Sequence, residues 1–247
     1  MFPETRCNFF IKNPFYYQQV QHGGYPVRNF VALIAYSLLL SGAYQPYLLA
    51  STERITVQIT DRNNIPIAGL VVMLNNTNTE QNTKTRTANA VMDQVNREFM
   101  PHILVIQQGT RVSFPNSDSV QHHVYSFSPA KTFELKLYRA LEAEPLLFDK
   151  AGIVELGCNV HDWMLGYIYV TNTPYFGQTD KNGVVTLIVP EGNYTLSLWH
   201  PRLSEQDIEQ QMSISTTTEN TLYLQLRAPL LPSLTDYNSG HGFSDYD

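Results

Sequence analysis

The segment 157–164 combines three residue types that bind soft metal ions. It places a thiol, an imidazole and a thioether at three-residue steps, as Cys158, His161 and Met164. A copper ion that alternates between one and two positive charges needs strong donors that both oxidation states accept, and two imidazoles with one thiolate meet that need. A thioether then serves as a weak axial ligand. The segment therefore predicts three of the four ligands of a copper site.

A second histidine must come from elsewhere in the chain. The segment 116–126 follows an expected strand at 111–114 and contains the adjacent residues His122 and His123. Both imidazoles are candidates for the missing ligand, and the residue types alone do not decide between them.

Other metals and catalysis fit the composition less well. A structural zinc site uses four Cys and His ligands, and iron–sulfur clusters need several thiolates, whereas the chain has only Cys7 and Cys158. Four protein ligands leave no open position for a substrate on copper. No His-x-His pair and no Gly-x-Ser-x-Gly elbow occur in the sequence. We therefore expect a copper protein that is not an enzyme.

The first 50 residues have the pattern of an export signal. An apolar run at 30–43 follows Arg28 and ends in small residues, which is typical of a secretory signal and its cleavage site. The run is shorter than the roughly 20 residues of a membrane-spanning helix. We expect residues 1–50 to be a cleaved leader that takes Cys7 with it. The mature protein then lies in the periplasm without stable membrane insertion, where an unpaired Cys158 should be buried or metal-bound.

The charge of the chain argues against a nucleic-acid partner. The formal net charge is −6, and 15% of the residues are charged. Such a mildly acidic surface lacks the basic footprint that nucleic acid requires.

Short alternating segments predict an all-β chain. They have period-two patterning and are bounded by turns rich in Gly, Pro, Asn and Asp. A helical turn or two is expected at 88–97. Periodicity is lost after residue 228, so we expect a disordered tail at 229–247. The expected strands lie at 55–59, 103–106, 111–114, 167–170, 184–189, 194–199 and 221–226.

The segments that flank 88–173 resemble a single β-sandwich. Residues 55–74 are similar to the opening of a carboxypeptidase-regulatory-like or transthyretin-like sandwich, and 179–196 carry the Thr-Asp-x-x-Gly and Pro-x-Gly-x-Tyr turns of the same family. Because the two parts are far apart in the sequence, we infer a domain insertion. A small sandwich of residues 51–87 and 174–228 is expected, with a copper domain at 88–173 in one of its loops. One continuous, larger sandwich is the alternative.

The segment 99–172 resembles the cupredoxins, which are type 1 blue copper proteins. The resemblance depends on Gly-Thr-x-Val-x-Phe-x-Asn at 109–116, His-x-Val at 122–124 and Cys-x-x-His-x-x-Met at 158–164, with the ligand-loop spacing of amicyanin. The segment is also similar to bacterial cupredoxin-like proteins that are labelled methylamine utilization proteins. The resemblance implies a Greek-key β-sandwich that holds one copper ion, as Cu+ or Cu2+. The implied ligands are His122, Cys158, His161 and Met164.

Three further residues are expected near the implied site. His123 occupies the position of a cupredoxin Asn that braces the ligand loop by a bond to the backbone beside the cysteine. Its imidazole could donate the same bond, or it could replace His122 as the ligand. His102 is a candidate for a donor around the site, an electron exit, an auxiliary copper ligand or a simple turn residue. Trp163 is expected to cover the site with apolar surface.

A type 1 site closed by four protein ligands implies outer-sphere electron transfer, and the expected leader places the protein in the periplasm. Cys158 is then the inner route for the electron, and His161 is the exit near the surface. The alternatives are a copper chaperone or resistance protein without electron traffic, and a redox module that the flanking sandwich docks onto another component. The sequence does not indicate the redox partner, since a fold does not fix a function.

Overall fold

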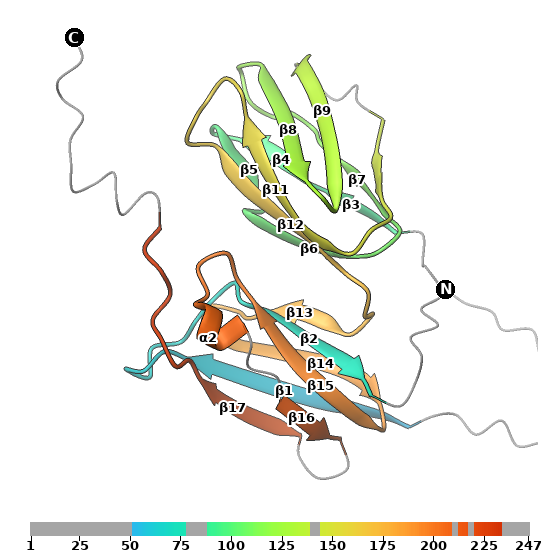
Figure 1. The fold of residues 1–247 in the computed structure, drawn as a ribbon, viewed down its shortest axis with the longest axis vertical. Helices are drawn as coiled ribbons and strands as arrows, with labels where there is room; N and C mark the ends of the chain where they lie inside the picture. The colour runs from blue at the N-terminus through green and yellow to red at the C-terminus, as the bar shows by residue number, and fades with distance from the viewer. Residues whose placement is uncertain (1–50, 78–87, 139–143, 209–211, 217–219, 234–247) are drawn as a thin grey trace, which may run out of the picture. The chain divides into compact units, whose positions relative to one another are not determined.

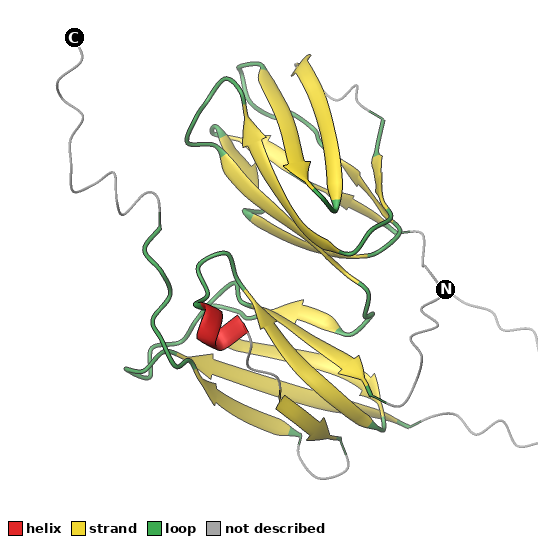
Figure 2. Ribbon diagram, in the orientation of Figure 1, coloured by secondary structure: helices red, strands yellow, loops and turns green. Residues whose placement is uncertain are grey.

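The fold is built almost entirely from β-strands. The computed structural model describes residues 51–233 except 78–87, 139–143, 209–211 and 217–219. Figure 1 and Figure 2 show strands throughout this part, and α2 (Glu205–Ile208) is the one helix among the described residues. The prediction of an all-β chain is confirmed. No helix in the described part is long and apolar enough to span a membrane.

Two predicted segments fall wholly or partly outside the described residues. The expected leader, 1–50, lies outside them, as does the greater part of the expected tail, 234–247. Residues 229–233 form neither strand nor helix, and the Leu231 N–H donates to the Arg202 carbonyl at 2.8 Å.

The strands between residues 89 and 171 form three sheets. A five-stranded sheet has the order β6-β12-β11-β8-β9, in which β6 and β12 are parallel and the other neighbours are antiparallel. Its strands are β6 (Ile103–Gln107), β8 (His122–Ser128), β9 (Lys131–Tyr138), β11 (Gly152–Cys158) and β12 (Leu165–Thr171). A three-stranded sheet of order β10-β7-β3 contains β3 (Asn89–Val91), β7 (Thr110–Ser113) and β10 (Leu146–Phe148). The strands β4 (Asp93–Val95) and β5 (Glu98–Met100) pair with each other.

A single apolar cluster fills the space between these sheets. Side chains along a strand alternate between its two faces, and β8 accordingly alternates between buried and partly exposed residues over most of its length. The cluster includes Phe99, Phe114 and Phe148, and also Cys158 and Met164. Burying one large apolar side chain contributes about 1.5–3 kcal/mol. Two of the predicted metal ligands are therefore fixed in a packed core.

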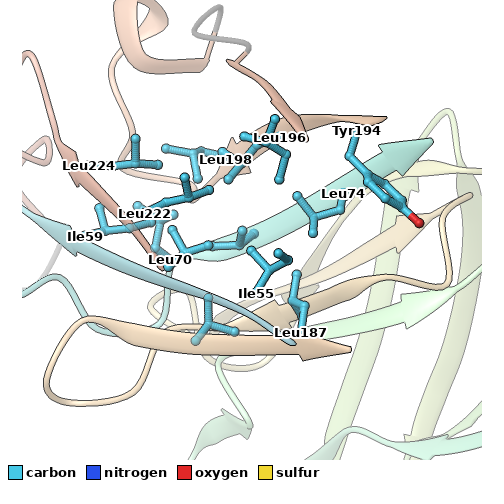
Figure 3. Packing of buried hydrophobic residues seen from close by; sticks show 14 of the residues in the cluster. Ile55, Ile59, Leu70, Leu74, Leu187, Tyr194, Leu196, Leu198, Leu222 and Leu224 are labelled. Atoms are coloured by element: carbon cyan, nitrogen blue, oxygen red, sulfur yellow. The ribbon is translucent and has the colours of Figure 1, made fainter. Parts of the chain in front are cut away.

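The strands before and after this part share two other sheets. One has the order β14-β1-β17 and the other the order β13-β2-β15-β16. Their inward side chains form one buried cluster, and Figure 3 shows Leu70, Leu74 and Leu196 gathered in it. The strands are β1 (Thr52–Thr60), β2 (Val71–Asn76), β13 (Phe176–Gln178), β14 (Val184–Pro190), β15 (Asn193–Trp199), β16 (Met212–Ser215) and β17 (Thr221–Gln225).

The helical turn that the sequence analysis expects at 88–97 is wrong. These residues form β3, β4 and the turn that follows β4. Gln94 is fully buried, its side-chain amide donates to the Pro115 carbonyl at 2.8 Å, and its backbone N–H donates to the same carbonyl at 3.1 Å. Such long-range bonds outweigh the weak helix propensity of this segment, because tertiary context routinely overrides propensity.

Gly166 on β12 lies where a side chain has no room. A Cβ at this position would lie 2.7 Å from the Cβ of Phe99, which is 1% exposed. We expect Gly166→Ala to lower the free energy of unfolding by about 1–3 kcal/mol, because a packed core resists added volume. Urea unfolding checks this value. Gly192→Ala is the control, since its nearest neighbour would be 3.6 Å away; equal losses in the two variants would contradict the close contact.

The predicted domain insertion leads to a test on a fragment. We expect residues 88–173 alone to fold and to bind copper, because Phe99, Phe114 and Phe148 of the core and the predicted ligands all lie within them. Circular dichroism and copper content of the purified fragment check this. A fragment that stays unfolded would favour one continuous sandwich.

Candidate metal centre

The pairing of β8 with β11 brings the first two predicted ligands together. His122 is the first residue of β8, and Cys158 is the last residue of β11. The strands run antiparallel, with Cys158 opposite Val124 and Gly157 opposite Tyr125. Both His122 and Val124 are buried, so the imidazole of His122 lies on the same inner side as the sulfur of Cys158.

The loop between β11 and β12 carries the other two predicted ligands, His161 and Met164. Two backbone hydrogen bonds shape it: the Asn159 N–H donates to the His123 carbonyl at 3.0 Å, and the Met164 N–H donates to the His161 carbonyl at 3.0 Å. The first bond ties the loop to β8, and the second closes a turn within it. The loop is therefore held in shape by the protein itself.

Three of the four predicted ligands converge on one point. The Cys158 Sγ lies 3.7 Å from the His122 Nδ1 and 3.8 Å from the His161 Nδ1, and each of the three residues offers a ligand atom within 4.8 Å of the other two. A metal such as zinc has bonds of about 2.3 Å to sulfur and about 2.0 Å to nitrogen, so a trigonal arrangement separates these atoms by about 3.7 Å. The observed distances fit a metal ion between the three donors.

Met164 belongs to the same buried region. It is 2% exposed and lies in the apolar cluster that contains Cys158. Its role as the weak axial ligand stays a prediction. Two imidazoles, one thiolate and a nearby thioether make a donor set that suits copper better than zinc, because zinc sites rarely use a thioether.

The three donors differ in burial, and desolvation affects the pKa of His161. His122 is fully buried and Cys158 is 4% exposed, whereas His161 is partly exposed. Desolvation lowers the pKa of His161 below its usual value, electrostatic interactions with His122 and Arg97 lower it further, and Asp118 opposes them. A lowered pKa leaves the imidazole neutral at neutral pH, so its nitrogen lone pair is free for a metal.

Asp118 contacts a predicted ligand, and the sequence analysis did not identify it. Its Oδ2 lies 2.8 Å from the Nε2 of His122. Burial disfavours the ionised form of Asp118, but bonds from the Arg97 N–H, from His122 and from the Asn96 N–H outweigh it and lower the pKa of the carboxyl group. The segment containing Asp118 has the composition of an ordinary turn, so its sequence carried no signal for this contact.

His123 takes a different role from the one expected of its imidazole. Its Nε2 lies 2.8 Å from the Glu134 Oε1 on β9. The bond that ties β8 to the ligand loop comes from the backbone carbonyl of His123, which accepts from the Asn159 N–H. The described cluster of ligand atoms contains His122 and does not include His123.

Trp163 and His102 are not members of the cluster of three converging donors. The ring of Trp163 is 63% exposed, and its centroid lies 5.3 Å from that of His161. It covers one side of His161 and still presents a large apolar surface to solvent. His102 is exposed and packs edge-on against the ring of Tyr167 at 5.6 Å.

Comparisons with known proteins found similarity only to solved structures. No protein-family model matches the chain, and no curated protein matches it. A copper-containing nitrite reductase from Thermus scotoductus is 24% identical over 34% of this chain and 23% of its own length, with a TM-score of 0.33. A purple cupredoxin from Nitrosopumilus maritimus is 24% identical over 34% of this chain and 99% of its own, with a TM-score of 0.30. A reduced amicyanin mutant is 23% identical over 34% of this chain and 82% of its own, with a TM-score of 0.31. TM-scores this low do not establish a shared fold, so the metal site rests on the residues of this chain.

Cys158→Ser tests the assignment of the sulfur ligand. A serine hydroxyl is a poor ligand for copper at neutral pH and cannot give the thiolate absorption of a blue copper site. We expect the variant to lose any blue colour after copper loading while its circular dichroism stays unchanged. His102→Ala is the control and should keep the colour. A blue Cys158→Ser protein would show that the sulfur assignment is wrong.

Proposed function

We propose that this chain is a type 1 copper protein that transfers electrons by an outer-sphere route. The observation that carries the proposal is the convergence of the Cys158 Sγ with the Nδ1 atoms of His122 and His161, at 3.7 Å and 3.8 Å. The likeness of segment 99–172 to the cupredoxin sequence pattern supports it. A bound copper ion supplies one-electron chemistry by alternating between Cu+ and Cu2+.

The protein residues account for the other requirements of electron transfer. Cys158 and His122 hold the inner side of the metal within the packed core, where water is excluded. The backbone bonds of the ligand loop keep His161 in place in both oxidation states, so little rearrangement accompanies the electron. The exposed Trp163 lies beside the partly exposed His161, and this side of the site is the proposed exit.

Two further proposals concern the absence of catalysis and the location of the protein. With Met164 as the fourth ligand, no coordination position stays open for a substrate, and we propose that the centre is not catalytic. The pattern of residues 1–50 supports export to the periplasm, with one copper ion in the mature protein. A redox protein is the proposed partner, and its identity is not indicated by the chain.

Copper loading of the full protein separates electron transfer from its alternative. The proposal predicts an intense blue absorption and a reversible midpoint potential by voltammetry. A copper chaperone or resistance protein would instead hold colourless Cu+, resist oxidation and release the metal to a stronger acceptor. The second result would replace the first proposal with the alternative.

Met164→Leu tests the proposed axial ligand. Leucine has a similar volume and no sulfur, so the core around the site should stay packed. Because the thioether donates weakly to the metal, we expect the blue colour to persist and the midpoint potential to rise. Absorption spectra and voltammetry of the loaded variant check both. Complete loss of copper would show that Met164 is a primary ligand.

A further inference from the structure

The turn between β4 and β5 has an unusual backbone. Asn96 and Arg97 both have positive φ angles, 54° and 60°. Residues other than glycine seldom adopt this conformation, although it matches the two-residue turns that join antiparallel strands. Arg97 is the less usual of the two residues in this conformation, so hydrogen bonds from outside the turn help to hold it.

The carboxylate of Asp118 holds this turn from across the chain. Its Oδ1 accepts from the Asn96 N–H at 2.6 Å, and its Oδ2 accepts from the Arg97 N–H at 2.8 Å. Asp118 itself is fixed, since its N–H donates to the Asn116 side chain at 3.0 Å. The Asn116 amide in turn donates to the carbonyls of Val120 and Tyr138.

The same carboxylate makes a third contact, which reaches the metal centre. The Asp118 Oδ2 lies 2.8 Å from the His122 Nε2, while the Nδ1 of the same ring faces the Cys158 Sγ at 3.7 Å. Because an ionised carboxylate can only accept a hydrogen bond, the imidazole carries its proton on Nε2. The Nδ1 lone pair is then directed at the metal position.

The charge of the carboxylate would also act on a metal ion bound by His122. A hydrogen bond from a ligand imidazole to a carboxylate makes the imidazole a stronger donor, and a stronger donor favours Cu2+ over Cu+. The two turn N–H groups share the carboxylate with His122, so the turn moderates this effect.

We propose that Asp118 is a positioning residue that couples the Asn96–Arg97 turn to His122, fixes the imidazole tautomer and lowers the potential of the centre. The inference rests on the copper function proposed above. It adds the β4–β5 hairpin to the elements that define the site.

The first test is the midpoint potential of Asp118→Asn. The variant keeps the size of the side chain and removes its charge. We expect the blue colour to remain and the ratio of Cu2+ to Cu+ affinities to fall about tenfold, which for a one-electron couple raises the potential by about 59 mV. Should this variant fail to fold, Asp118→Ser removes the same charge with a smaller side chain, and the same rise is expected.

Asp93→Asn is the matched control. Asp93 also joins β4 to the loop at 116–118, since its Oδ2 accepts from the Ser117 hydroxyl at 2.7 Å and its Oδ1 accepts from the Gln94 N–H at 2.7 Å. It makes no described hydrogen bond to a predicted ligand. We expect this variant to lose thermal stability and to keep the wild-type potential. Equal potential shifts in both variants, or no shift in either, would overturn the role of Asp118.

A measurement on the copper-free protein tests the positioning role of Asp118 independently of the proposed copper function. Long-range 1H–15N NMR of the copper-free protein should show His122 protonated at Nε2. A proton on Nδ1 would overturn the inference even if the protein binds copper. Failure of the wild-type protein to bind copper would remove the proposed function and with it the effect on the potential, while the tautomer would still report on the positioning role.

Discussion

The pairing of Cys158 with Val124 across β11 and β8 is the constraint on which the metal centre depends. It places the end of one strand beside the start of another, so that His122 and Cys158 meet although 36 residues separate them. His161 follows on a loop whose backbone is bonded to β8 through Asn159 and His123. The positions of His122 and Cys158 are thus a consequence of strand register, and a one-residue slip would turn these two donors away from each other.

The surroundings of the donors suit a metal ion that changes its oxidation state with little movement of its ligands. A thiol and a fully buried imidazole lie in an apolar core, where electrostatic interactions are stronger than in water. The charge of Asp118 reaches this core through His122, while the partly exposed His161 faces the apolar ring of Trp163. One side of the site therefore lies in the protein interior, and the other side is partly exposed.

Local spacing in the sequence was sufficient to indicate Cys158, His161 and Met164 as candidate donors and to predict most strands. Cys158, His161 and Met164 follow one another closely, and period-two patterns mark strands such as 167–170 and 194–199. Local spacing was insufficient where contacts between residues far apart in the sequence determine the structure. The segment 88–97 forms strands because of the long-range bonds of Gln94. Asp118 contacts His122 where the β4–β5 turn and the start of β8 meet its carboxylate. The imidazole of His123 contacts Glu134 on the neighbouring strand. The resemblance of position 123 to a bracing Asn did not indicate this contact.

X-ray absorption at the copper edge of the loaded full-length protein tests the central claim most directly, because it reports which atoms bind the metal. We expect one sulfur at short distance and two imidazole nitrogens, from Cys158, His122 and His161, with the sulfur lost in Cys158→Ser. A wild-type shell of nitrogen and oxygen atoms without sulfur would contradict it.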